Sequence, residues 1–512
     1  MEKIGKLFNV LFCAAFGWVV AVVLFCMLKS FCIAVIATAM AIAAIVLLAK
    51  NSDNLPKINY NTVFYAVLAV SFIIMTALSF ALEVDYSWDW GRLIISASNY
   101  VMYGGYIDDV EYFATYPNNQ FWFTVLIGLF KFVKFILPQA QPEHFKFISI
   151  FVSVVMVQAS ILLTYETAKL FWGEKRAFFT GLAAVLFLPL YLYAMFAYTD
   201  TSGMLVLMLI LYFYEKAKRT EKIKRIAYCA AVGLFAALAY QIKVTVFIVF
   251  IAAIIEAAML IFKNKQSRGR LKEYAVCALS CVLAFAIAYG ATEGVVKSTV
   301  PISKSVADRY EFPLTHWVMM ALNKDGGYLE KDVKFTKKFK TKNAKELADK
   351  KRIKKRLAKM GAAGTVKHVM YKKVARTWGE SLLFGDEYAG RYPLHENGVL
   401  QKFLTRNGNL RSVTLLYAWP YYFILLLLVF ASGIVSIKKK LKDQKAFVCR
   451  LAMFGLFVFL LVWECNARYL VAFIPIIILA ASSGAFGLAD NAKAIDDFMK
   501  NTLRRKKRGA LR

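Results

Sequence analysis

Residues 82–120 read LEVDYSWDWGRLIISASNYVMYGGYIDDVEYFATYPNNQ and lead into the apolar stretch FWFTVLIGLFKFVKFIL, which ends at Leu137. This loop directly follows an apolar run that is long enough to span a bilayer. Among its aromatic residues stand the acids Asp85, Asp89, Asp108, Asp109 and Glu111. A plain connector between two membrane helices needs only a few turn-forming polar residues. The acids therefore predict an active-site loop at the membrane surface.

The composition of the whole chain indicates a membrane protein. The 512 residues are 59% hydrophobic and 15% aromatic, with a mean hydropathy of +0.52, which is too apolar for a soluble chain. Apolar runs of about 20 residues recur, and we expect an all-α, polytopic helical membrane protein with about 12 transmembrane helices. The candidate spans are Phe8–Leu28, Phe31–Ala49, Thr62–Leu82, Phe145–Leu170, Arg176–Phe196, Ser202–Tyr214, Arg225–Tyr240, Val244–Phe262, Lys272–Gly294, Val413–Ile437, Ala446–Trp463 and Tyr469–Leu488.

The charges of the short loops predict which side each one faces. Short basic loops are expected in the cytoplasm, namely Lys216–Arg225, Lys263–Lys272, Lys438–Lys445 and the tail. Residues 199–201, 241–243, 297–412 and 464–468 then lie outside. The opening loop also lies outside, provided that Asn119–Leu137 is a helix in the outer interface and does not cross.

These boundaries divide the chain into five parts. We expect an N-terminal hairpin with its connector (1–61), a transmembrane core that contains the loop 83–137 (62–296), an external cap (297–412), C-terminal helices (413–490) and a basic tail (491–512). The cap is basic, and Ala344–Met360 predicts a helix that is either a solvated surface or a contact for anionic headgroups or an anionic acceptor.

Several function classes are disfavoured. The net charge of +32 does not indicate nucleic acid, because no binding fold is visible and lysines that flank the membrane explain much of it. All eight cysteines lie in or beside apolar runs without metal-type spacing, so we expect neither a disulfide nor a cysteine metal site. The chain has no Walker loop, HExxH or nucleophile elbow, which disfavours an ATP-driven machine.

Ionisable residues at the predicted outer ends of several spans share one face. They are Asp89, Asp109, Asp200, Lys243, His316, Glu464 and Arg468. Asp89 stands between Trp88 and Trp90, where partial loss of water suits a carboxylate to accept a proton. Lys243 in AYQIKVTVF is placed to meet a lipid phosphate, or simply extends its ammonium to the membrane interface. Arg468 could pair with Glu464 or hold a phosphate. Each one could also be an ordinary loop residue, and the shared face is what indicates a site.

Five stretches, taken in order, resemble the GT-C superfamily of integral-membrane glycosyltransferases. They are SWDWGRLIISA, YPNNQFWF, AYTDTSGMLVLML, AYQIKVTVF and ECNARYLVAFIP. The similarity is to the branch with protein O-mannosyltransferases and lipid A aminoarabinose transferases. It implies a multi-pass enzyme of the cell membrane that takes a polyprenyl-phosphate-linked sugar donor and acts on its extracytoplasmic face, transferring the sugar to an acceptor glycan, polymer or protein.

The same resemblance implies roles for individual residues. Asp89 would be the catalytic base, Asp200 would position the acceptor, and Lys243 and Arg468 would bind the donor phosphate. The pocket would also be lined by Asp109, Tyr116, Asn118, Asn119, His316 and Glu464. Many relatives have an Asp-Glu pair where this chain has Asp89-Trp90. That difference leaves open a divalent cation, for which no ligands are assigned, and the choice of Asp89 over Asp85 or Asp109.

Two alternative functions remain. A transporter or flippase could use the same charges along its path, although no inverted repeat is evident and the charges stand at span ends. A polysaccharide polymerase or ligase would share the lipid-linked donor and the outer face.

Overall fold

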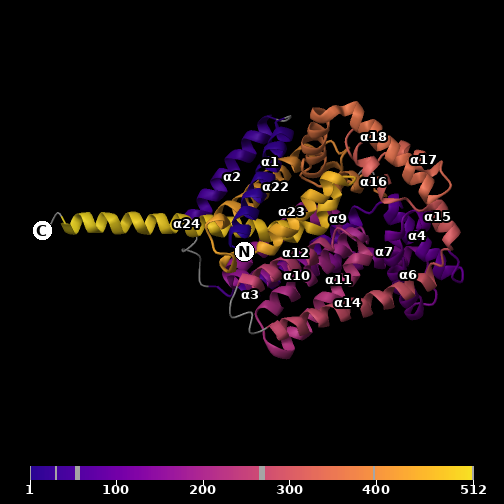
Figure 1. The fold of residues 1–512 in the computed structure, drawn as a ribbon, viewed down its shortest axis with the longest axis horizontal. Coiled ribbons are helices and arrows are strands. Elements are labelled where there is room, and N and C mark those ends of the chain that lie inside the picture. Colours follow the sequence, from indigo (N-terminus) through magenta and orange to yellow (C-terminus); the bar gives the residue numbers. More distant parts are fainter. Residues whose placement is uncertain (1, 29–30, 52–57, 264–270, 396–397, 510–512) are drawn as a thin grey trace.

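The protein forms an elongated bundle of helices. The computed structural model describes residues 2–28, 31–51, 58–263, 271–395 and 398–509. Within them the regular elements are all helical, apart from an isolated antiparallel bridge between Val84 and Pro393. Most long helices run along one axis, and the C-terminal helix α24 (Ile474–Gly509) projects from one end (Figure 1).

Within the described residues, eight helical stretches are long and apolar enough to cross a membrane. They are α1 (Glu2–Met27), α3 (Tyr60–Ala81), Pro117–Ile136, α7 (Pro142–Trp172), α11 (Lys222–Ile242), α14 (Leu271–Thr299), α22 (Arg411–Ile437) and Ala467–Lys493. Shorter apolar stretches lie in α2 (Phe31–Asn51), α12 (Ile248–Lys263) and α23 (Phe447–Val462), and α10 (Thr199–Lys218) covers another predicted span. Eleven of the twelve predicted spans therefore lie mainly in these helices, and the polytopic all-α class is confirmed.

The predicted span Arg176–Phe196 is wrong as one continuous helix. It is divided into α8 (Glu174–Val185) and α9 (Leu188–Tyr193). Pro189 stands in the first turn of α9, where its missing N–H is tolerated, whereas inside a continuous helix it would remove a hydrogen bond.

The helix α6 (Gln120–Ile136) lies across one end of the bundle. Near its start, the Trp122 indole donates a hydrogen bond of 2.9 Å to the carbonyl of Ala197. Near its end, Phe130 stacks on Phe145 of α7 with ring centroids 4.8 Å apart. Both neighbours lie near the same end: Lys146, next to Phe145, bonds the Val84 carbonyl at the exit of α3, and Phe196, next to Ala197, packs against Trp90 with ring centroids 5.3 Å apart. These contacts join α6 to neighbours near that end; by length and composition the segment is also a candidate span, so its interfacial placement stays a prediction.

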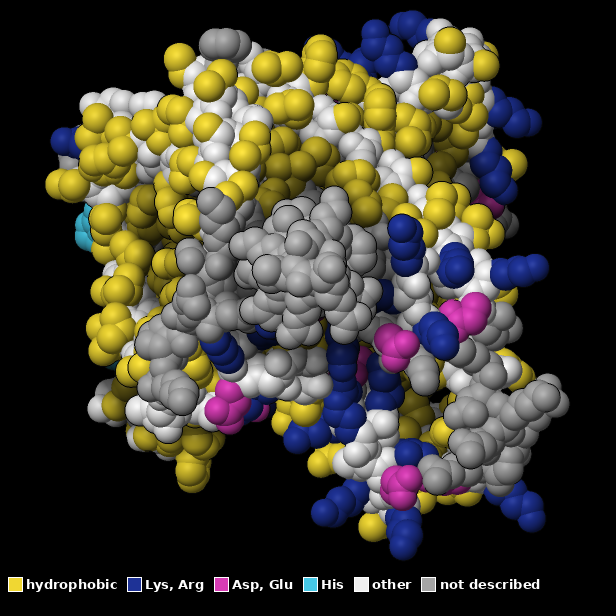
Figure 2. Space-filling view, turned by 90° about the vertical axis from the view of Figure 1, so that its left-hand side faces the viewer, with side chains coloured by type: hydrophobic (Ala, Val, Ile, Leu, Met, Phe, Trp, Pro, Cys, Tyr) yellow, Lys and Arg dark blue, Asp and Glu magenta, His cyan; other side chains and the backbone are white. Residues whose placement is uncertain are grey.

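The basic loops meet at the opposite end. There the Leu441 amide donates to Glu2, Arg225 pairs with Glu273 at 2.7 Å, and the fully buried Arg450 bonds Asn9. Figure 2 views this end and shows many Lys and Arg side chains on it. The predicted cytoplasmic loops Lys216–Arg225 and Lys438–Lys445 thus share one end, and the predicted external loops share the other; most of Lys263–Lys272 lies outside the described residues.

The cap is helical and sits over the loop 83–137. Its helices are α15 (Lys304–Tyr310), α16 (Leu314–Ala321), α17 (Glu330–Lys337), α18 (Lys342–Lys367), the π-turn η2 (His368–Lys373), α19 (Val374–Trp378), α20 (Gly385–Ala389) and α21 (Val399–Leu404). The helix α18 contains the basic helix that the sequence predicts. Lys337 pairs with Glu111 of the loop at 2.9 Å, and the Cys465 amide bonds the Gly326 carbonyl at 2.9 Å. The cap is therefore attached to both the first loop and the C-terminal connector.

Candidate functional site

Asp89 occupies the first turn of α4 (Trp88–Met102), in a tightly held backbone. Trp88 begins this helix with a φ of 43°, a left-handed conformation that is rare for a bulky side chain. A Cβ on Gly91 would lie 2.8 Å from the Tyr86 backbone, so only glycine fits there. The left-handed residue directly before a half-buried acid is the kind of local strain that functional sites retain.

A hydrogen-bonded network fixes the Asp89 carboxylate. Tyr112 of α5 (Val110–Thr115) donates to its Oδ1 at 2.8 Å, and Tyr198 lies 3.3 Å from its Oδ2. Asn119 donates to the Tyr112 hydroxyl at 2.7 Å, and its Oδ1 lies 3.2 Å from the Tyr198 hydroxyl. Asn118 donates to that same Oδ1 at 3.1 Å. Burial and the Asp89 charge raise the pKa of Tyr112, so this hydroxyl keeps its proton and continues to donate.

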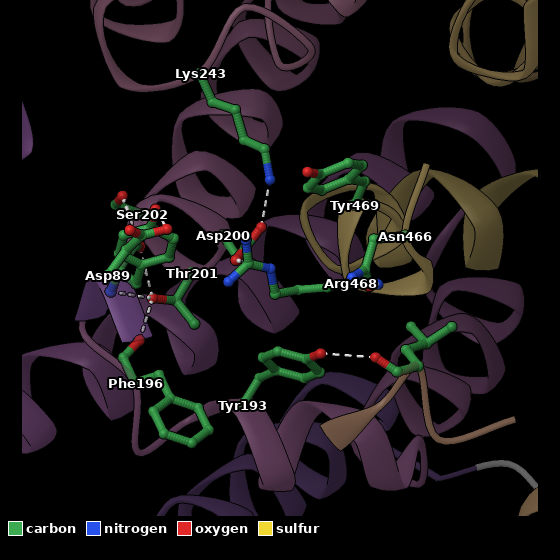
Figure 3. Close-up of polar contacts among 12 residues, drawn as sticks. Asp89, Tyr193, Phe196, Asp200, Thr201, Ser202, Lys243, Asn466, Arg468 and Tyr469 are labelled. Atoms are coloured by element: carbon green, nitrogen blue, oxygen red, sulfur yellow. Dashed lines mark hydrogen bonds and ion pairs between the residues drawn. The ribbon is translucent and has the colours of Figure 1, made fainter. Parts of the chain in front are cut away.

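Asp200 lies at the centre of a second cluster. It is 1% exposed, in the first turn of α10, and accepts a hydrogen bond from the ammonium of Lys243, which follows α11. The Nε of Arg468 lies 3.5 Å from the other carboxylate oxygen. Arg468 belongs to η4 (Ala467–Phe473), whose start is capped by the Asn466 side chain. Figure 3 shows the two cations approaching Asp200 from different elements. Two cations against one carboxylate leave an excess of positive charge.

Aromatic rings enclose the Arg468 guanidinium and join the two clusters. Its carbon lies 4.7 Å from the ring centre of Trp88, 5.4 Å from Tyr198 and Tyr388, and 5.9 Å from Tyr469. Such contacts stabilise a cation that has lost most of its water. Because Tyr198 also bonds Asp89, the acid and the cations form one site.

Glu464 is adjacent to the cluster but does not take the predicted ion pair. It is 2% exposed and accepts a hydrogen bond from the Tyr469 hydroxyl. Burial raises the pKa of Glu464. The ion pair of Arg468 is with Asp200, so the Glu464–Arg468 alternative is wrong.

Asp109 and Tyr116 lie outside the network around Asp89. Asp109 caps α5 through the Tyr112 amide at 3.1 Å and pairs with Arg92 at 3.0 Å. Tyr116 packs against Phe312 of the cap, with ring centroids 6.0 Å apart. Tyr116 also packs against Tyr112 with ring centroids 5.2 Å apart, so Asp109 and Tyr116 both contact Tyr112 without bonding Asp89, and their place in the pocket stays a prediction.

His316 is enclosed in the cap, and the expectation that it lines the site is corrected. Its ring has no exposed surface, stacks on Phe312 at 4.0 Å and bonds Thr336 at 2.8 Å. Burial, together with the positive charge of Lys345, lowers the pKa of His316 to about 3, so the ring is neutral. The partners of His316 belong to the folded interior of the cap.

In the part of the chain that the structure describes, Asp89 belongs to no group of side chains that could bind a metal ion. Within the ranges that the structure describes, no three His, Cys, Asp or Glu side chains come together as ligands. The polar atoms around Asp89 belong to two tyrosines and an asparagine. The described residues would therefore offer a divalent cation a single carboxylate at this point.

Sequence reasoning missed the aromatic part of the site. Trp88 and Tyr198 stand within two residues of the predicted Asp89 and Asp200, and that proximity was an available signal. Tyr112 lies in the acid-rich loop, among several similar tyrosines. Tyr388 comes from the distant cap, and no local pattern connects it with Arg468.

Together these observations define a polytopic helical membrane protein with an acid and a cation cluster joined at one end of its bundle. A protein-family model described as "conserved hypothetical integral membrane protein" matches residues 4–485. The match covers most of the chain, and the protein belongs to this family. No curated protein matches the chain significantly.

Proposed function

We propose that this protein is a GT-C-type membrane glycosyltransferase. It would transfer a sugar from a polyprenyl-phosphate donor to the hydroxyl group of a glycan, polymer or protein on the extracytoplasmic face of the cell membrane. The observation that supports this most is the pairing of a fixed carboxylate, Asp89, with a cluster that has excess positive charge, through the shared residue Tyr198. Glycosyl transfer from a phosphate needs both a base and a cation site.

The residues divide between the two ends of the reacting bond. Asp89 accepts the proton of the acceptor hydroxyl as its oxygen attacks the anomeric carbon. The bond from that carbon to the phosphate oxygen breaks, and the polyprenyl phosphate leaves with the electron pair. Lys243 and Arg468 stabilise the negative charge of the departing phosphate. This single displacement inverts the configuration of the anomeric carbon.

Asp200 has a different role from the one that the family resemblance implies. Its carboxylate is buried and engaged by both cations, so in the proposal it holds Lys243 and Arg468 in place and does not contact the acceptor. The interfacial helix α6 begins at Asn119–Gln120, beside Asp89, and would guide the apolar tail of a donor in the bilayer.

The test compares Asp89→Asn with Asp85→Asn in liposomes that contain polyprenyl-phosphate-linked sugars and candidate acceptors. Asp85 is an exposed acid in the same loop, and its carboxylate bonds only the adjacent Tyr86 amide among the described residues. We expect Asp89→Asn to lower turnover about 10²–10⁴-fold, the range for a lost general base. Donor binding, measured as thermal stabilisation, should persist in Asp89→Asn and disappear in Lys243→Met.

Two results would contradict the proposal. One is equal turnover in wild type and Asp89→Asn. The other is movement of a solute or lipid across the bilayer without transfer of sugar, which would favour a transporter.

A further inference from the structure

A large open groove lies at the basic end of the bundle, at the other end from Asp89. Its volume is about 1210 Å³. The helices α12 and α14 form its sides, and residues of α10 and α11 also line it. Drug-sized ligands occupy pockets of about 300–1,000 Å³, so this groove has room for a larger molecule.

The apolar lining faces the place where lipid tails would lie. Ile254 and Phe262 of α12 are 52% and 72% exposed, and Leu271 of α14 is 57% exposed. All three line the groove. Since the hydrocarbon of the bilayer surrounds these helices, a chain can enter sideways without passing through water.

The length of the groove corresponds to one leaflet. Its lining on α14 extends from Leu271 to Cys281, about 15 Å of helix at 1.5 Å per residue. The hydrocarbon core is about 30 Å thick, so this is half of it. A phospholipid acyl chain has this reach, whereas a long polyprenyl chain exceeds it.

The mouth of the groove is polar and basic. Lys218, Arg225 and Lys440 line it, together with one acid, Glu2, which accepts a hydrogen bond from the Leu441 amide. Lys218 is held by Glu256 at 2.9 Å and Arg225 by Glu273 at 2.7 Å, while Lys440 has no acidic partner among the residues that the structure describes. The connectors at this mouth read KAKRTEKIKR (216–225) and KKKLKDQK (438–445), so cations exceed acids there (Figure 2).

We propose that the groove binds one anionic phospholipid of the leaflet at the basic end. Its acyl chains lie between α12 and α14, and its phosphate lies at the mouth beside Lys440. Basic pockets between transmembrane helices bind anionic headgroups in this way. The site is separate from the one proposed for glycosyl transfer and does not depend on that activity.

The experiment uses the full-length protein in nanodiscs with photoactivatable lipids that carry a diazirine on one acyl chain. Phosphatidylglycerol is compared with phosphatidylcholine and with a polyprenyl phosphate, and the labelled peptides are identified by mass spectrometry. Ala278→Trp fills the groove from an exposed position on α14, and Ala286→Trp is its matched control, two turns along the same helix and outside the groove. Lys440→Gln removes the charge at the mouth, and the exposed Lys438→Gln is its control.

We expect phosphatidylglycerol to label peptides from 250–262 and 271–281 in preference to phosphatidylcholine. Ala278→Trp should abolish this labelling, and Lys440→Gln should lower the preference about fivefold, as expected for one basic residue at an anionic surface. Both controls should label like wild type. Equal labelling by the two phospholipids, labelling that survives Ala278→Trp, or labelling by polyprenyl phosphate alone would overturn the proposal. Lys440→Gln stays informative if the tryptophan variant fails to fold.

Discussion

The charge balance of the Asp200–Lys243–Arg468 cluster can be tested by removing its members separately. Asp200→Asn leaves two cations together in a site where their side chains are only 16% and 12% exposed. Removing one partner of a buried ion pair costs about 3–5 kcal/mol, because the remaining charge has no counterion. Lys243→Met instead leaves Asp200 facing Arg468 and removes a buried ammonium. We expect it to change the free energy of unfolding by less than about 1 kcal/mol.

The double variant Asp200→Asn/Lys243→Met should lie between the two single variants, since it retains one cation within its aromatic rings. Thermal unfolding of the purified protein in detergent gives the order of stabilities. The exposed pair Glu346–Lys350 on α18 serves as a control, and neutralising it should change stability by less than about 0.5 kcal/mol. If Lys243→Met were as destabilising as Asp200→Asn, or if the effects simply added in the double variant, the inferred excess of positive charge would be refuted.

Two further predictions concern other parts of the molecule. A Cβ at Gly233 of α11 would lie 2.0 Å from a carbonyl oxygen of α14. Gly233→Ala should therefore force the two helices apart and lower the free energy of unfolding by about 1–3 kcal/mol. The control Gly290→Ala adds its Cβ in open space and should not lower the melting temperature. In the cap, burial lowers the pKa of His316 to about 3. As the pH falls from 6.5 to 5, the unfolded chain binds a proton at this histidine and the folded chain does not, so the free energy of unfolding falls by about 2 kcal/mol. Burial raises the pKa of Asp349 to about 6, which has the opposite effect over this range, so acidification should stabilise the cap of His316→Gln. A loss of hydrogen-exchange protection of the cap amides between pH 6.5 and pH 5 in this variant would contradict this.

The fold was largely predictable because each span is a local property. An apolar run of sufficient length has to form a helix in lipid, since its backbone groups find no water there. The predicted span Arg176–Phe196 divides just before Pro189, whereas α22 continues through Pro420, so a proline within an apolar run did not by itself reveal the break. The interfacial placement of α6 is a prediction from the sidedness of the basic loops, because a crossing at this segment would put later loops on the wrong side; the contacts of Trp122 and Phe130 show which residues α6 packs against.

The sequence predicted site residues only where an ionisable side chain stands next to an apolar membrane span. Asp89, Asp200, Lys243 and Arg468 could be found because an ionised group beside a membrane helix needs a partner or a function. Their pairing could not be found, since three separate elements meet at Asp200 and no sequence spacing encodes that meeting. His316 shows the converse: in a cap with its own interior, a histidine can satisfy its hydrogen bond at Thr336 and stay away from the site. An ionisable residue therefore indicates a site more strongly next to a span than within a loop that is long enough to bury it.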